Sequence, residues 1–154
     1  KAPGGQDLLR SFFNRISALS DFRFVIFELI NPMNSSEDKK VYMLLKSVIF
    51  HYHGLDEAEK VELEKTASEL EAFPEYQWAL DFISRDFITA FDRARDYLNN
   101  IIGDYPKNKR VQLITMVWEA NNQKGYVTEM EATAMLRLAR DWNVKEELIG
   151  LVLR

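Results

Sequence analysis

Apolar residues recur every three or four positions along most of the chain, and this spacing predicts amphipathic helices joined by short polar connections. Two such segments precede Pro32, and a third starts at Ser36 and ends at Gly54. Residues 22–30 are also rich in strand-forming side chains, but the chain has no second strand-like segment to pair with them. The hydrophobic pattern therefore predicts an all-α fold.

Capping and turn residues divide the middle of the chain into helices. Asp56 followed by Glu59 predicts a capping box, in which each side chain binds the free backbone N–H of the other residue. Pro74 suits the first turn of the next helix, because its missing N–H would have no helical partner there. Apolar positions then continue at helical spacing up to Gly103, which predicts one long helix or two nearly collinear helices. The apolar side of this segment consists of Tyr76, Leu80, Ile83, Phe87, Phe91, Ala94, Leu98 and Ile101.

The last part of the chain has similar helix boundaries. Pro106 starts a helix, and Gly125 turns the chain. Thr128 with Glu131 then predicts a second capping box, and a short connector at residues 141–144 leads to a last helix. Three further helices are therefore expected after the long central segment.

Two segments, residues 39–70 and 108–142, share the order apolar helix, glycine, capping box, apolar helix. The second is two residues longer around its turn. The matched pairs are Val41 with Val111, Leu44 with Ile114, Gly54 with Gly125, Asp56 with Thr128, Glu59 with Glu131, and Ala67 with Ala139. We interpret the two segments as a duplicated helix–turn–helix unit, with convergence of two antiparallel helical hairpins as the alternative.

The motif Gly-x-hydrophobic-Ser/Thr/Asp-x-x-Glu between two helices, present twice about seventy residues apart, resembles the TerB-like domains of tellurite resistance and related stress proteins. The resemblance covers roughly residues 39–154 and is closest at "KGYVTEMEATAMLRLARDWNV". It implies an all-helical fold, a link to stress response, and metal binding. The chain departs from the family pattern before each turn glycine, where His53 and Lys124 replace an Asp. Because a Lys ammonium has no lone pair for a metal, the resemblance supports the fold more than the metal site.

The segment "HYHGLDEAE" contains both histidines of the chain. His51 and His53 are two residues apart, whereas zinc-binding histidines on a helix are usually three or four apart. If the helix ends before Gly54, then His53, Asp56 and Glu59 could still converge on one ion. The alternative is a histidine at a helix C-terminus, favoured by the helix dipole, beside a structural capping box. The candidate metal ligands are His53, Asp56, Glu59 and Glu131.

The stretch "ANNQKGYVTEME" resembles the end of a calcium-binding loop that lacks its acids. Gly125 and Glu131 occupy the positions of the turn glycine and the last carboxylate, but Ala120 and Lys124 stand where oxygen ligands are needed. We interpret the stretch as a structural turn between two helices.

Composition narrows the classes of function. The chain has 154 residues, of which 47% are hydrophobic, and this is enough for one well-packed core. We predict one compact domain of about seven to nine helices, with residues 1–35 as an N-terminal helical extension.

A net charge of −4 argues against nucleic-acid binding, and no apolar run is long enough to span a bilayer. The absence of cysteine excludes disulfides and thiolate metal sites, and cytoplasm is the simplest location. Because the chain begins with Lys1 rather than Met, we expect that it was excised from a longer protein.

Two surfaces are candidates for partner binding. The segment "ISRDFITAFDRARDYLNN" alternates in charge at helical spacing, which predicts a solvated helix face with ion pairs between residues four apart, or a docking surface. Its charged residues are Arg85, Asp86, Asp92, Arg93, Arg95 and Asp96. The Phe-rich segment at residues 8–30 is expected in the core, with an apolar groove or a homodimer contact as the alternative.

These observations favour a non-enzymatic, TerB-like domain with a stress-associated or scaffold role that works by binding a protein partner. Weak sensing of a divalent metal through the four candidate ligands would add to this role, and no other cofactor is predicted. A first alternative is a degenerate EF-hand-like regulatory module, although Gly54 and Gly125 are 71 residues apart, whereas paired EF-hand loops would be about 36 apart. A second alternative is an unrecognised enzyme that uses His51 or His53 as a base or ligand.

Overall fold

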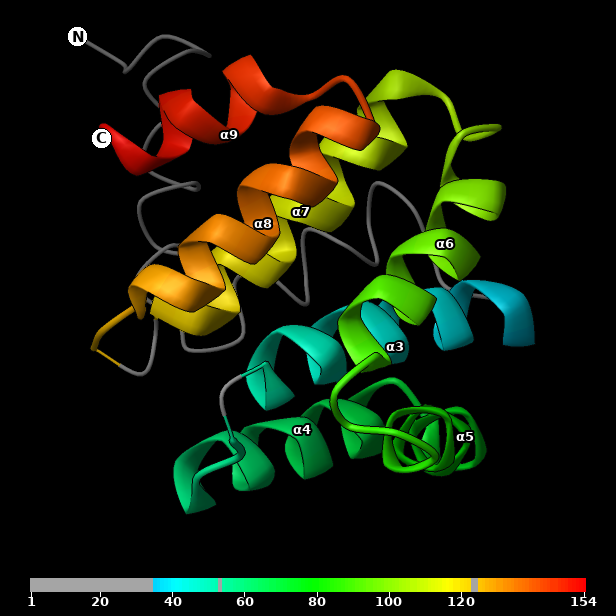
Figure 1. Cartoon of the computed structure of the whole chain (residues 1–154). Coiled ribbons are helices and arrows are strands. Elements are labelled where there is room, and N and C mark those ends of the chain that lie inside the picture. The colour runs from blue at the N-terminus through cyan, green and yellow to red at the C-terminus, as the bar shows by residue number, and fades with distance from the viewer. Residues whose placement is uncertain (1–34, 53, 123–124) are drawn as a thin grey trace, which may run out of the picture. The chain divides into compact units, whose positions relative to one another are not determined.

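The computed structural model describes residues 35–52, 54–122 and 125–154, and the two helices predicted before Pro32 lie outside this part of the chain. The described residues form helices and connecting turns without a strand, which confirms the all-α prediction. None of these helices is both long and apolar enough to cross a membrane. In the numbering of Figure 1 the helices are α3 (Ser36–His51), α4 (Glu57–Glu69), α5 (Phe73–Ser84), α6 (Ala90–Ile102), α7 (Lys107–Asn122), α8 (Glu129–Asp141) and α9 (Lys145–Val152).

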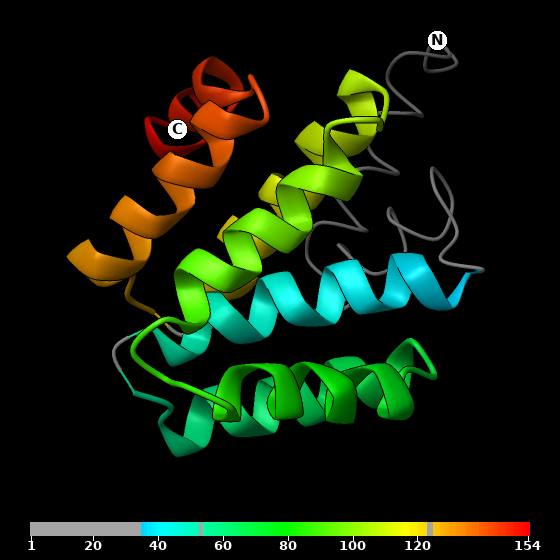
Figure 2. The same cartoon turned by 45° about the vertical axis from the view of Figure 1, so that its right-hand side comes forward.

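Helix α3 is the centre of the core. All ten residues from 41 to 50 are buried, because α3 packs against α4, α5, α6, α7 and α8. Figure 2 shows α3 between α4 and α5 on one side and α6 to α8 on the other. One buried position is charged: the Nζ atom of Lys46 donates to Oε1 of Glu62 at 3.0 Å and to Oγ1 of Thr66 at 2.6 Å. The buried ammonium is therefore hydrogen-bonded, as burial of a charge requires.

Helices α5 and α6 are not collinear, which corrects the prediction made from their shared apolar spacing. The rings of Trp78 and Tyr97 lie 5.3 Å apart, whereas 19 residues of continuous helix would separate them by about 28 Å. The chain turns back at residues 85–89, and α6 packs beside α5. Phe87 was expected on the buried stripe but lies in this turn with its side chain exposed. Helical spacing cannot show that a helix is interrupted when the residues after the break keep the same period.

The similarity between the two segments extends beyond the helix–turn–helix unit. Helices α4 and α8 end in the same Schellman motif, with a left-handed residue at Glu71 (φ 51°) and at Asn143 (φ 55°), which are 72 positions apart. The amide of Ala72 donates to the carbonyl of Ala67 at 2.8 Å. In the second segment the equivalent bond, from the amide of Val144 to the carbonyl of Ala139, has the same length. Helices α5 and α9 each begin directly after this motif. The repeated unit therefore has three helices, α3–α5 and α7–α9.

The first helices of the two units align with an offset of 71 rather than the 70 implied by pairing Val41 with Val111. The amide of Gly54 donates to His51 and that of Gly125 to Asn122, and both bonds close the end of the first helix. Helices α3 and α7 also begin 71 positions apart and have the same length. The pairing of Val41 with Val111 is one residue away from this alignment. Apolar side chains occur at several neighbouring positions of both helices, so more than one pairing fits the sequence.

Candidate functional site

Three turns gather at one end of the bundle formed by α3 to α9. Tyr126, in the α7–α8 turn, donates from its hydroxyl to Oδ2 of Asp56, in the α3–α4 turn, at 2.8 Å. The α5–α6 turn contacts the end of α3 through the pocket described next. We call this end the turn end, meaning residues 51–60, 84–93 and 121–131 as far as the structure describes them. Figure 2 shows the turns together, with α4, α6 and α8 starting there.

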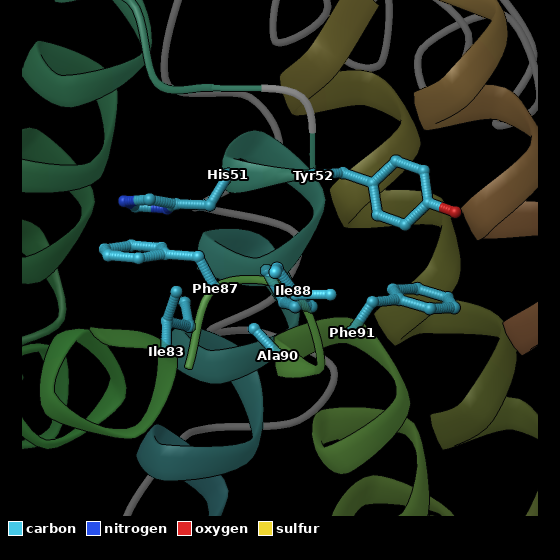
Figure 3. A pocket seen from close by; sticks show the side chains of 8 residues that line it. His51, Tyr52, Ile83, Phe87, Ile88, Ala90 and Phe91 are labelled. Carbon is cyan, nitrogen blue, oxygen red and sulfur yellow. The ribbon is translucent and has the colours of Figure 1, made fainter. Parts of the chain in front are cut away.

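The α5–α6 turn and the C-terminus of α3 enclose a small pocket of about 60 Å³. Figure 3 shows the His51 and Phe87 rings on one side of it and the Tyr52 and Phe91 rings on the other, with Ile88 between them. The Tyr52 and Phe91 rings pack edge to face, with centroids 5.0 Å apart. The lining residues are Val48, His51, Tyr52, Ile83, Phe87, Ile88, Ala90 and Phe91. The pocket is therefore lined mainly by apolar and aromatic side chains.

Phe87 and Ile88 are exposed beside this pocket, by 67% and 93% of their surface. Their backbone is held in place by Asp86, which accepts the Ile88 amide at 3.0 Å and the Thr89 hydroxyl at 2.9 Å. These two hydrogen bonds lower the pKa of Asp86. The guanidinium of Arg93 donates to the carbonyls of Phe82 at 2.9 Å and Asp86 at 2.8 Å, which ties the turn to both helices. The turn thus presents two adjacent apolar side chains to solvent on a hydrogen-bonded support.

His51 has a defined hydrogen bond but no catalytic neighbours in the described lining of the pocket. Its Nδ1 lies 2.7 Å from the carbonyl oxygen of Ser47, which can only accept, so Nδ1 carries a proton. In the neutral ring Nε2 is then left with a lone pair. No carboxylate or nucleophilic hydroxyl belongs to that lining, where Tyr52 supplies a phenol. Within the described lining, these groups do not form the nucleophile–base–acid arrangement that general acid–base catalysis uses, and His53 lies outside the described residues.

The candidate metal ligands Asp56 and Glu59 form the predicted capping box. Glu59 donates its amide to Oδ1 of Asp56 at 2.8 Å, and Oε2 of Glu59 accepts the Asp56 amide at 3.0 Å. Oδ2 of Asp56 accepts from Tyr126. Glu131 is buried in the first turn of α8, where its amide donates to Thr128 at 3.1 Å. Within the described residues no three His, Asp or Glu side chains are grouped to hold a metal ion, and His53 lies outside them, so the four-ligand site stays a prediction.

Four of the six charged residues predicted on a solvated face are exposed, while Arg93 and Arg95 bond to other helices and turns. Arg93 fixes the α5–α6 turn, and Arg95 pairs with Asp141 of α8, with Nη2 and Oδ1 2.8 Å apart. This pairing, with help from Asn99, lowers the pKa of Asp141. Arg85 remains an exposed cation at the end of α5. Sequence spacing could not show partners that are 46 positions away.

The opposite end of the bundle is joined by hydrogen bonds between polar side chains of different helices. We call it the closed end, meaning residues 35–40, 70–75, 99–110 and 140–147. Oδ1 of Asp38 accepts from the Tyr105 hydroxyl at 2.8 Å and from Nζ of Lys109 at 2.9 Å. Burial opposes ionisation of Asp38, but the hydrogen bonds from Lys109 and Tyr105 outweigh it and lower its pKa. The indole N–H of Trp142 donates to Asn99 at 2.9 Å. These contacts join segments that are distant in sequence.

Sequence reasoning missed Phe87 and Ile88 as surface residues. A signal was present, because Asp86 stands two and three positions before Ile88 and Thr89, the spacing of a side chain that caps a turn. Tyr126 and Met130 are also exposed at the turn end. Of the nine large apolar side chains that are exposed in the described part of the chain, four therefore lie there.

Comparisons with known proteins assign no function to this site. A scan against protein-family models matched nothing, and searches of curated proteins and of solved structures found no significant match. The resemblance to TerB-like domains consequently stays a prediction from the sequence.

Proposed function

We propose that this chain is a non-catalytic, TerB-like scaffold domain that binds a protein partner through the turn end. The observation that carries the proposal is the exposed pair Phe87 and Ile88 beside an aromatic pocket. Adjacent exposed apolar side chains at a cleft are typical of protein interaction sites, because water contact with them is unfavourable until a partner covers them. A stress-associated role is the biological context that the sequence resemblance implies.

Three features favour binding over catalysis or metal sensing. The pocket lining has a histidine without an acid or nucleophile among the described residues. Asp56 and Glu59 are engaged as a helix cap. The Asp86 and Arg93 contacts hold the apolar pair in a fixed conformation, which reduces the conformational entropy lost on binding. Each of these contacts supports a preformed surface rather than a reaction centre.

Photo-crosslinking tests the proposal. A benzophenone amino acid at position 88 of the full chain is exposed to an extract of the source cells, and position 73 is the control. Phe73 is also highly exposed, at 55%, but lies at the closed end, at the start of α5. We expect a discrete adduct from position 88 that unlabelled wild-type chain competes away and the Phe87→Ser, Ile88→Ser chain does not. Equal adducts from both positions, or none from position 88, would contradict a binding role for the turn end.

A further inference from the structure

The turn end contains more acidic than basic residues. Its three segments contain seven acidic and four basic residues in the sequence, hence a net charge of −3 against −4 for the whole chain. Glu57, Asp92 and Glu129 are exposed in the first turns of α4, α6 and α8. Of the basic residues, Lys60 and Arg85 are exposed, whereas Arg93 is bonded to carbonyl oxygens of α5 and of the α5–α6 turn. Among the described residues of the turn end, five exposed acidic residues therefore outnumber two exposed basic ones. We call Glu57, Asp92 and Glu129 the acidic rim.

A second copy of this chain is a poor occupant for the same surface. The exposed parts of Phe87 and Ile88 amount to roughly 300 Å², so this apolar pair supplies less than half of the roughly 800 Å² that each partner buries in a stable interface. A two-fold dimer would also bring the two acidic rims face to face, because such an interface places the same patch on both subunits. Both the size and the charge of the surface suit a short segment of different composition.

We propose that the turn end binds a short, basic protein segment that carries one or two large apolar residues. The apolar residue would contact Phe87 and Ile88 and enter the pocket between His51 and Phe91, while flanking Lys or Arg side chains pair with Glu57, Asp92 and Glu129. This assignment rests on the proposed function and specifies the chemistry of its partner. Charge complementarity of this kind sets specificity and association rate, and the same negative charge disfavours anionic membranes and nucleic acids as ligands.

Selection from a random library of displayed 12-residue peptides tests the assignment directly, because the library contains basic, acidic and uncharged sequences alike. The full chain is the bait, and the Phe87→Ser, Ile88→Ser chain removes peptides that bind elsewhere. We expect the enriched peptides to combine Leu, Ile, Phe or Met with several Lys or Arg. Enrichment of acidic or uncharged peptides, or no enrichment over the apolar variant, would overturn the proposal.

Affinity measurements then isolate the role of the rim. Fluorescence anisotropy compares an enriched peptide on wild-type chain, on the rim variant, and on a variant with matched changes at the closed end. The rim variant is Glu57→Gln, Asp92→Asn, Glu129→Gln, and the matched variant is Glu37→Gln, Asp104→Asn, Glu146→Gln, all at exposed positions. Glu37 and Glu146 are also first-turn acids, so the effects on helix dipoles are similar, and thermal melts verify folding of both variants.

We expect the rim variant to bind about five- to tenfold more weakly, the matched variant to stay within about twofold, and added salt to reduce the difference. Equal affinities of the two variants would overturn the basic character of the partner. Crosslinking at position 88 would still succeed in that case, so failure of this assignment is distinguishable from failure of the proposed function. Dimerisation of the wild-type chain that Ile88→Ser abolishes, seen by sedimentation velocity, would instead assign the surface to a second copy.

Discussion

The closed end and the turn end differ in what their side chains contact. At the closed end, Asp38, Tyr105, Lys109 and Trp142 bond to one another or to neighbouring helices. At the turn end, hydrogen bonds hold the backbone of the α5–α6 turn, while Ile88 remains in water. The closed end has one large exposed apolar side chain, Phe73, whereas the turn end has four, including the adjacent pair Phe87 and Ile88.

The residues that stabilise the fold and the residues proposed to bind a partner are therefore different ones. An exposed apolar pair contributes little to folding, since it is in contact with water in both the folded and the unfolded chain. A buried side chain with a satisfied polar group contributes both packing and a hydrogen bond. Substitutions at the two ends should therefore affect different measurements.

The largest difference in the free energy of unfolding is expected between the Trp142→Ala and Ile88→Ser variants. Trp142 is 2% exposed and its indole N–H bonds to Asn99, so its removal should lower the free energy of unfolding by about 3–5 kcal/mol. Ile88→Ser should change it by about 0.5 kcal/mol or less. Urea unfolding followed by circular dichroism measures both values. A cost above about 1 kcal/mol for Ile88→Ser would show that Ile88 is part of the core.

A smaller contrast lies within the turn end itself. Arg93→Ala leaves the carbonyls of Phe82 and Asp86 without their donor and should cost about 1–3 kcal/mol. Arg85→Ala removes an exposed cation and should cost less than about 0.5 kcal/mol. Urea unfolding of the two variants gives the comparison. Equal costs would mean that the α5–α6 turn does not depend on the Arg93 contacts.

Acid should weaken the closed end through Asp38 and Asp141. The pKa values of Asp38 and Asp141 are lowered in the folded chain, so the unfolded chain takes up protons at a higher pH than the folded chain does. Their contribution is present above the unfolded value of about 3.8 and is lost as the pH falls through the lower folded values. Between pH 6 and pH 3, wild-type chain should lose more unfolding free energy than the Asp38→Asn, Asp141→Asn chain. Parallel pH profiles would assign the acid sensitivity to other carboxylates.

Local signals predicted the helices and their caps, whereas contacts between distant segments could not be predicted. Spacing of apolar residues indicated the helices, and Asp56 with Glu59 indicated a capping box that the structure contains. These features depend on residues a few positions apart. The partnership of Arg95 with Asp141 depends on the path of the whole chain, and so does the fold-back of α6 on α5.

The candidate site was predicted only in part for the same reason. The sequence directed attention to the α3–α4 and α7–α8 turns, and the Tyr126–Asp56 bond places them together. The apolar pair at the same end of the bundle comes from a third turn, in which Phe87 continues the helical period of α5. Periodicity assigned Phe87 to the core because it measures sequence spacing and not the direction of the chain.

The smallest expected effect compares the two Schellman motifs of the repeated unit. Glu71 and Asn143 hold the same left-handed conformation, which crowds the Cβ of most residues but suits glycine and is tolerated by asparagine. Glu71→Gly should therefore raise the unfolding free energy by about 0.5–1 kcal/mol, while Asn143→Gly should leave it within about 0.3 kcal/mol. Glu71→Ala, which removes the charge but keeps the Cβ, controls for electrostatics and should give no gain. Equal stabilisation by both glycine substitutions would contradict this prediction. It would mean that Glu71 and Asn143 pay the same conformational cost for the left-handed backbone, so that asparagine has no advantage over glutamate there.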